Sequence, residues 1–361
     1  MGKRELVLIL AFVFLGTILY QATAPPKPEG RGFSLRGMID NIRREVGARH
    51  EYLADERTQA IPIGAGIAEV RLVGPGDLRI EGTDGAQAIA TLQVYSTGLD
   101  ENEARALGKK TVLKTSGAGD LLSLEMSYPR EGRQRAMMTI RLPRRLRVRV
   151  SRVSRLEARN LGGVELDNTR GPATVSAIAG IVRGTHNGGE LTLEHVKAID
   201  LAARRSEMTI AGVDGPVRLD LTGGTCRARD IAGDFDVDGN RVDLDIEGLA
   251  GTLTADLSQG SIEVTRLAKQ ARVDARGTEI RIALERPVPI SAITTDEDVN
   301  VRLPEHGGFT LDATVENGEI RLPERAPAPA RTGQTTIAQG AIRGGGPTLS
   351  LRTTHGDIVV R

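Results

Sequence analysis

Apolar and polar residues alternate with a period of two over short stretches that begin near residue 61. In Ile67–Leu72 and again in Asp77–Glu81 every second residue is apolar, and Gly74-Pro75-Gly76 separates the two stretches. This pattern predicts two strands that each bury one side, joined by a tight turn. Similar stretches follow at 90–95, 121–126 and 137–142, and the polar stretch 100–109 favours a helix. We therefore expect residues 60–160 to form an N-terminal β cap with a short helix.

A regular repeat begins near residue 161. The residue that precedes each alternating stretch recurs every eight or nine positions, and nine of these twelve positions are glycine. They are Gly163, Gly171, Gly180, Gly189, Ala198, Glu207, Gly215, Gly224, Gly233, Val242, Gly251 and Gly260. A nine-residue unit holds one short strand and one turn, which is too little to close a core of its own. Neighbouring units must therefore stack to bury their inward side chains.

This repeat predicts a β-solenoid over residues 161–325. Two units per coil give an 18-residue coil, and five or six coils spaced by about 4.8 Å make a rod roughly 25–29 Å long. An antiparallel β-sandwich is the alternative, because short strands at regular spacing also suit that architecture. The constant spacing of eight or nine residues favours the solenoid. The Pro-, Ala- and Gly-rich stretch 326–346 is expected to be a flexible loop, and 347–361 the last strands of the same domain.

The N-terminus predicts export or membrane anchoring. Lys3 and Arg4 precede the apolar stretch Leu6–Tyr20, which is typical of a signal-peptide core or a short membrane anchor. Ala22-Thr23-Ala24 has the form of a cleavage site, but Pro25 would follow the scissile bond, so residues 1–24 form either an uncleaved anchor or a cleaved signal peptide. Positive charge stays on the cytoplasmic side. The remainder is therefore expected to face the periplasm or the cell exterior.

Residues 25–59 are expected to form a spacer and a juxtamembrane helix. The spacer is rich in proline up to Pro28, and Leu35, Ile39, Ile42, Val46 and Leu53 then follow one another at helical spacing. The same predicted helix also carries several arginines. The helix could dimerise the chain or lie on lipid headgroups, or it could be a solvated stalk; Gly37 and Gly47 favour the stalk.

Composition excludes several classes of function. The net charge is +1 and the chain has five Phe, four Tyr and no Trp. Nucleic-acid binders need a basic surface or aromatic stacking platforms, so no nucleic-acid partner is expected. The single cysteine, Cys226, cannot form an internal disulfide. The alternation of residues along the strand around it predicts that its side chain is buried. An exported domain of this composition must be held together by packing alone.

Candidate chemistry is sparse, and we predict no catalytic residue, no metal site and no cofactor. Asp234, Asp236 and Asp238 imitate the start of a calcium-binding loop, but strand alternation explains them as outward side chains. The five histidines show no metal-ligand spacing and are expected at the surface. A sugar-cleaving site on an exposed sheet is the enzymatic alternative. It would use Asp243, Asp245, Glu247, Arg227 and Arg229.

One basic cluster stands out. Eight arginines lie within nineteen residues: Arg141, Arg144, Arg145, Arg147, Arg149, Arg152, Arg155 and Arg159. Arg145, Arg147 and Arg149 alternate with Leu146, Val148 and Val150, which predicts a strand with one cationic face. This face is the candidate contact for an anionic envelope polymer or lipid headgroups. The structural alternative is that the arginines protect a sheet edge from aggregation.

The C-terminal part resembles the DUF4097 family, whose members are described as "putative adhesins". The resemblance rests on Val299–Pro304, on Phe309–Ile320 with its Asn317-Gly318 turn, and on Gly344–Val360 with its His355-Gly356 turn. Asn and His tolerate the left-handed conformation that such turns require. With the strand repeats and the exported N-terminus, the similarity extends over about 61–361. It implies an all-β fold and no catalytic residues.

These observations predict a membrane-anchored, extracytoplasmic, non-enzymatic adhesin or surface scaffold protein. Its partners would be the membrane, through the N-terminal segment, and an anionic envelope polymer or a membrane protein. An envelope-stress sensor or accessory protein is the first alternative, and a carbohydrate-active enzyme is the second.

Overall fold

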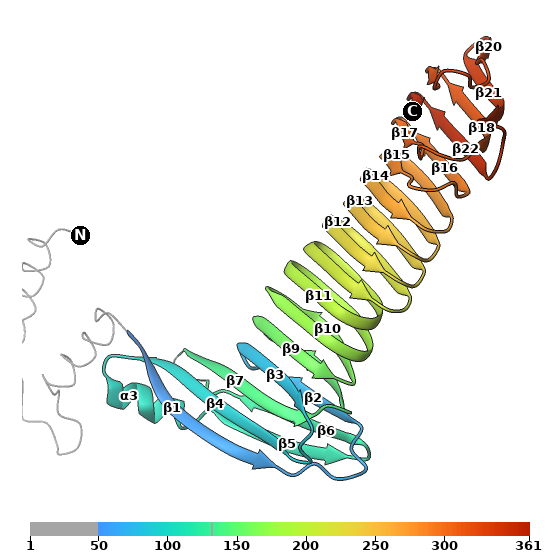
Figure 1. Cartoon of the computed structure of the whole chain (residues 1–361). Coiled ribbons are helices and arrows are strands. Elements are labelled where there is room, and N and C mark those ends of the chain that lie inside the picture. The colour runs from blue at the N-terminus through green and yellow to red at the C-terminus, as the bar shows by residue number, and fades with distance from the viewer. Residues whose placement is uncertain (1–49, 131–132) are drawn as a thin grey trace, which may run out of the picture. The chain divides into compact units, whose positions relative to one another are not determined.

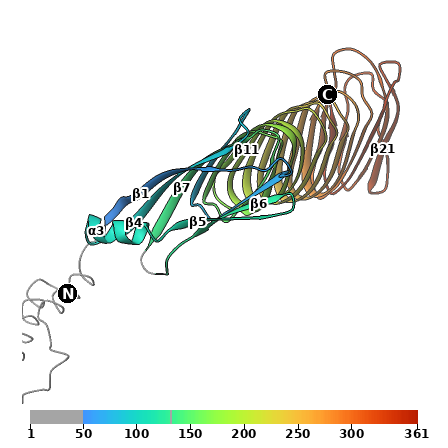
Figure 2. The same ribbon diagram turned by 90° about the horizontal axis from the view of Figure 1, so that it is seen from below.

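The computed structural model describes residues 50–130 and 133–361, and this part of the chain is almost entirely β-structure (Figure 1). Its centre is a stack of coils, each with two strands. Strands of successive coils pair in parallel, and Figure 2 shows them stacked one upon another between the two ends. The predicted β-solenoid is therefore confirmed, and the antiparallel sandwich is wrong for the repeat region.

The central coils keep the predicted period. They are built from β10 (Gly163–Thr169), β11 (Ala173–Val213), β12 (Val217–Ile231), β13 (Phe235–Leu249), β14 (Leu253–Leu267) and β15 (Ala271–Ala283). Val217 pairs with Phe235, Phe235 with Leu253 and Leu253 with Ala271, so the register advances by one coil without slipping. A constant register keeps equivalent side chains in columns along the stack.

Each coil has two outer faces, which enclose one apolar core. Face 1 contains the first half of each long strand, such as Val217–Thr222, and face 2 contains the second half, such as Gly224–Ile231. The turn that leads from face 1 to face 2 is called the corner. Leu219 and Ile210 point inward and are 1% and 0% exposed, whereas Arg218 and Asp220 are exposed. Period-two alternation thus assigned the inner and outer positions correctly.

Left-handed backbone occupies one corner position in successive coils. Arg205, Gly223, Arg241, Gln259 and Gly277 have φ angles of 49°, 68°, 56°, 62° and 56°. The same conformation occurs at Asn317 and His355, with φ of 58° and 59°. The conformation predicted for these two turns is therefore confirmed. At the corner the chain turns from face 1 to face 2 within two or three residues, and a residue in the left-handed conformation makes this tight turn possible.

The stack begins earlier in the chain than residue 161. β2 (Glu69–Val73) and β3 (Asp77–Thr83) form a coil that lies between the coil of β6 (Leu121–Ser127) and β7 (Gln134–Pro143) and the coil of β8 (Arg147–Ser151) and β9 (Arg155–Leu161). β2, β6, β8 and β10 belong to face 1, and β3, β7 and β9 belong to face 2. Segments far apart in the sequence therefore pair directly.

The C-terminal end is interleaved in the same way. Its strands are β16 (Ile290–Thr295), β17 (Val299–Arg302), β18 (Phe309–Glu316), β19 (Ile320–Arg321), β22 (Thr348–Thr354) and β23 (Ile358–Val360). β22 pairs with both β16 and β18, and β23 pairs with both β17 and β19. The last coil of the chain thus lies inside the stack, between two coils that precede it in sequence.

Antiparallel strands cover both ends of the stack. At the N-terminal end, β4 (Ala88–Gly98) pairs with β7, β1 (His50–Ile61) pairs with β4, and β5 (Val112–Ala118) pairs with β6. The helix α3 (Glu101–Gly108) packs on β1 and β4, and its N-terminus is capped by Asp100, whose carboxylate accepts from the Glu103 N–H at 2.8 Å. At the other end β21 (Thr335–Ile342) pairs with β18, and β20 (Ala330–Thr332) with β21.

Two predicted segments differ from the structure. Residues 50–59 were expected in the spacer and juxtamembrane helix, but they lie in β1, because this strand is paired with β4 along nearly its whole length. Residues 326–346, expected to form a flexible loop, contain β20 and β21; Thr336, Ala338 and Ile342 of β21 are buried.

The predicted anchor Leu6–Tyr20 and the rest of the spacer, residues 25–49, lie outside the described residues. Within 50–130 and 133–361, no helix is both long and apolar enough to cross a membrane.

Candidate functional site

Arg147 and Arg149 lie on β8, in the interior of the sheet, whereas Arg145, predicted on the same strand, lies in the turn that precedes it. β8 pairs with β2 on one side and with β10 on the other. The proposal that these arginines protect a sheet edge is therefore wrong, since β8 has no free edge. Leu146, Val148 and Val150 are buried as alternation predicts, with exposures of 0%, 1% and 0%.

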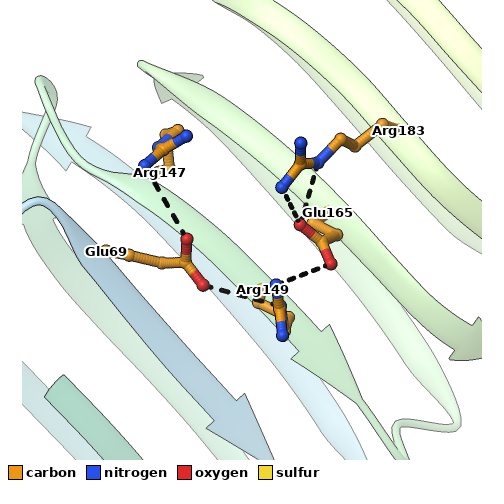
Figure 3. Close-up of polar contacts among 5 residues, drawn as sticks. All are labelled: Glu69, Arg147, Arg149, Glu165 and Arg183. Atoms are coloured by element: carbon orange, nitrogen blue, oxygen red, sulfur yellow. Dashed lines mark hydrogen bonds and ion pairs between the residues drawn. The ribbon is translucent and has the colours of Figure 1, made fainter. Parts of the chain in front are cut away.

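Acidic side chains on neighbouring coils pair with Arg147 and Arg149, two of the three arginines predicted on this face (Figure 3). The Arg149 Nη2 lies 2.9 Å from Oε1 of Glu165 on β10, and its Nε lies 3.5 Å from Oε1 of Glu69 on β2. Arg147 Nη2 lies 4.0 Å from the other oxygen of Glu69. Glu69 and Glu165 therefore attract Arg147 and Arg149 across the sheet, although Arg71 of β2 lies in register with Arg149.

The same row continues to the next coil. Glu165 Oε2 accepts hydrogen bonds from Arg183 Nε at 2.9 Å and Nη2 at 2.6 Å. Figure 3 shows the resulting series of five side chains, Arg147, Glu69, Arg149, Glu165 and Arg183, which we call the ion-pair ladder. Burial alone would raise the pKa of the Glu165 carboxyl, but the Arg183 hydrogen bonds and the charges of Arg149 and Arg183 together lower it. The two arginines therefore favour the charged form of Glu165.

Arg145 takes no part in the ladder. Its Nη1 donates a hydrogen bond to the main-chain oxygen of Ile67 at 2.7 Å, across to the segment that enters β2. The three predicted contact arginines thus have three different environments. Arg145 holds a neighbouring loop, Arg147 is the most loosely paired, and Arg149 is held between two carboxylates.

The other arginines of the cluster spread over both faces and the turns. Arg159 of β9 lies 3.0 Å from Glu81 and Arg152 lies 2.8 Å from Glu125. Arg144 lies 2.8 Å from Asp84. Eight arginines close together in sequence therefore do not form one positive surface, because successive strands face opposite sides of the stack.

Sequence reasoning did not identify Glu69 and Glu165 as partners of the arginines. Glu165 follows Arg149 in the sequence by close to the length of one coil, so the repeat contained a usable signal. Glu69 lies much earlier in the chain and becomes a neighbour only because β2 inserts beside β8. No periodicity in the sequence indicates that insertion.

Buried polar groups are few, and one corrects a prediction. His186 was expected at the surface with the other histidines, but it is 0% exposed, and its Nδ1 lies 3.1 Å from the Thr169 hydroxyl. Its Nε2 has no hydrogen-bond partner among the residues that the structure describes. Desolvation lowers the pKa of His186 despite a backbone contact with Gly189 that raises it. Cys226 is 1% exposed, and burial followed by the charge of Asp245 raises its pKa to about 12, so it is inert as a nucleophile.

The candidate enzymatic groups are also placed by the structure. Arg227, Arg229, Asp245 and Glu247 all lie on face 2, in the adjacent strands β12 and β13. Arg229 Nε lies 3.3 Å from Glu247, which also receives Arg266 at 2.9 Å. Across residues 50–130 and 133–361, no three His, Cys, Asp or Glu side chains converge in a way that could hold a metal ion. The Glu247 carboxylate therefore takes part in ion pairs between coils.

Surface hollows are shallow and lie between coils. One of about 550 Å³ on face 1 is lined by Ile181, Ala198, Pro216 and neighbouring residues, and one of about 420 Å³ on face 2 is lined by Arg281, Asn300, Arg302 and Arg361 among others. Neither combines a deep floor with convergent polar groups.

The chain is similar to a known protein family. The family model described as Toastrack DUF4097 matches residues 130–361. The chain belongs to this family. The match covers most of the parallel stack and the C-terminal cap, which are the parts from which the resemblance was drawn. No curated protein matches the chain.

Three solved structures are similar to this member of the Toastrack DUF4097 family. A "putative cell adhesion protein" from Clostridium sporogenes is 13% identical, with a TM-score of 0.20 and coverage of 85% of this chain and 98% of that chain. A "Putative lipid binding protein" from Parabacteroides distasonis is 14% identical, with a TM-score of 0.31 and coverage of 85% and 97%. A "putative adhesin" from Bacteroides fragilis is 12% identical, with a TM-score of 0.25 and coverage of 85% and 97%.

Proposed function

We propose that this protein is a non-enzymatic, extracytoplasmic surface scaffold, held at a membrane by Leu6–Tyr20. The observation that carries the proposal is the continuous stack itself. From β6 to β19 it has one apolar interior and two polar outer faces, and many of its charged side chains are engaged with the next coil. Such a body maintains a fixed spacing along its length and displays regular rows of side chains, as a scaffold requires.

The N-terminal segment supports the membrane part of this proposal. Lys3 and Arg4 precede fifteen mostly apolar residues, and Pro25 is a poor residue after a cleavage site. A reporter enzyme fused after Arg361 should therefore be active only outside the cytoplasm, and the full-mass chain should fractionate with membranes. A soluble product that begins at Pro25 would contradict anchoring, and a reporter active in the cytoplasm would contradict export.

Contact with an anionic envelope polymer through β8 is a narrower proposal. Arg147 is the best candidate, since its side chain is 54% exposed and lies 4.0 Å from Glu69. Arg149 is 35% exposed and is already held by two carboxylates. An incoming anion would have to compete with those carboxylates, which would make Arg149 a poor contact residue.

Single glutamine substitutions test this difference. The chain should bind vesicles that contain anionic lipid more tightly at low salt than at high salt. Arg147→Gln should weaken that binding more than Arg149→Gln does. Arg155→Gln, which removes an exposed arginine from face 2, is the matched control and should leave binding unchanged. Equal effects of all three substitutions would assign the binding to overall charge and would contradict a contact on β8.

A further inference from the structure

Two rows of charged side chains, most of them without an ion pair among the described residues, run side by side along one corner of the stack. The first row lies on face 1 next to the corner and contains Asp220, Asp238, Asp256 and Asp274. Each aspartate pairs in register with the next, so the four carboxylates follow one another at about 4.8 Å. We call this row the aspartate row.

The aspartate row is poorly compensated within the chain. Asp274 lies 2.9 Å from Arg272, but the side chains of Asp220, Asp238 and Asp256 form no ion pair or hydrogen bond with any described residue. The row does not form a metal-binding group within the described part of the chain. Like charges placed on neighbouring strands repel one another, so this surface is more stable when positive charge lies against it.

The second row lies on the corner itself and contains Arg204, Arg205, Arg241 and Arg276, which we call the arginine row. All four are exposed. The corner positions between them are occupied by uncharged residues, among them Thr222, Ser258 and Gln259. Arg241 Nε donates to Asn240 at 3.2 Å, and none of the four arginines pairs with a described carboxylate.

The two rows do not neutralise each other within one chain, although they lie close together in the sequence of each coil. Two acids beyond the corner on face 2 have other partners: Glu279 lies 2.5 Å from Arg281, and Asp243 accepts from the Ser261 hydroxyl at 2.8 Å. The aspartates occupy four successive coils and the arginines every second coil, so the corner presents an acidic row beside a sparser basic row, and the two rows share the coils of β13 and β15.

We propose that this corner is an interface between two copies of the chain, arranged in parallel around a two-fold axis that runs along the stack. Such an axis places Arg241 of one copy against Asp238 of the other at the same height, and each remaining arginine faces an aspartate of the same coil or of the next coil. A two-fold axis across the stack would instead make the copies antiparallel and place like charges together. Charge complementarity therefore favours a second copy of the chain as the partner and a parallel arrangement of the two copies.

The residues of one coil show how the contact is made. In the coil of β13, Asp238 and Arg241 flank Asn240, so the two-fold axis passes close to the column of Thr222, Asn240 and Ser258. Arg241 of each copy then meets the aspartate at position 238 of the other. A parallel pair also places the N-terminal ends of both stacks on the same side, which suits two chains in one membrane but does not depend on anchoring.

Cysteine cross-linking of the full-length chain tests the geometry. Ser258→Cys lies in the column near the axis and should cross-link to the same position of a second copy at low salt. The native Cys226 is buried and should not cross-link. Ala250→Cys is an exposed position in the turn opposite the corner and is the matched control. Cross-linking at position 258 should exceed that at 250 at least severalfold and should fall as salt is raised; equal yields, or yields insensitive to salt, would overturn the proposal.

Charge reversal tests the pairing itself. On the Ser258→Cys background, Arg241→Asp and Asp238→Arg should each lower the cross-linked fraction severalfold, because each brings like charges together. The two substitutions combined recreate the pair with its signs exchanged and should restore the yield to within about twofold of the parent. Arg227→Asp, which makes the same charge change on face 2, should leave the yield unchanged. A combined variant no better than either single variant would overturn the proposal.

Discussion

Gly251 lies against the backbone of Gly233, one coil away. A Cβ added to Gly251 would lie 2.1 Å from the Gly233 carbonyl oxygen, and a Cβ added to Gly233 would lie 2.2 Å from the backbone of Gly215. Three glycines, one from each of three successive coils, thus stack in the turn opposite the corner. The glycine repeat is required there by close approach of backbones from successive coils.

Replacing Gly251 with alanine should therefore lower the free energy of unfolding by about 1–3 kcal/mol, because the turn must move away from the neighbouring coil. Chemical denaturation of the two proteins measures the change. Gly66→Ala is the matched control, since a Cβ at that position has no atom within 4 Å. Its effect should stay within about 0.5 kcal/mol. Equal effects at the two positions would contradict the stacking argument.

The ion-pair ladder should contribute measurable but modest stability. In a double-mutant cycle with Arg149→Gln and Glu165→Gln, we expect a coupling of about 0.5–1 kcal/mol, since both side chains are partly exposed and water weakens the pair. The pair Arg272–Asp274 is the comparison, with side chains 69% and 40% exposed at the same 2.9 Å separation. Its coupling should be smaller. A larger coupling for the exposed pair would show that burial does not set the strength of these contacts.

Buried His186 should make the fold sensitive to mild acid. Its pKa is lower in the folded protein than in the unfolded chain, so the unfolded chain takes up the proton first. The free energy of unfolding should therefore fall as pH drops through the unfolded value, about 6.5. Above that pH the histidine is neutral in both states and adds no pH dependence.

Denaturation curves between pH 7.5 and 5.5 test this effect. His186→Leu should flatten the dependence on pH, whatever its effect on stability at neutral pH. His306→Gln, at an exposed histidine, should leave the dependence as it is. An unchanged slope in the His186 variant would show that other groups cause the loss of stability in acid.

Removing residues 347–361 should open the stack in its interior. β22 and β23 lie between two other coils, and Leu349, Leu351 and Ile358 are all 0% exposed. Their loss should expose the backbone of β16 and β18, because each would lack its parallel neighbour. Amide exchange should rise sharply in these two strands and stay slow in β12 to β14, since coils contact only their neighbours. Uniformly slow exchange would mean that the C-terminal coil is dispensable.

The local pattern determined much of this fold. Alternation fixed which side chains point inward, as Leu219 and Arg218 show, because the two-residue period of a strand needs no tertiary information. The spacing of glycines fixed the length of the coil, since only a repeated turn with close backbone approach demands glycine so regularly. Turn chemistry at Asn317 and His355 was also local and was read correctly.

Only the tertiary structure decided which coils are neighbours at the two ends and which charges meet. β2 pairs with β8, and β22 lies between β16 and β18, although each pairing joins segments far apart in sequence. Any strand with the right alternation satisfies the local rules, so the choice between parallel partners depends on how all the coils pack together. For this reason the sequence predicted a cationic strand at Arg145, Arg147 and Arg149, whereas the fold placed Glu69 and Glu165 on either side of it.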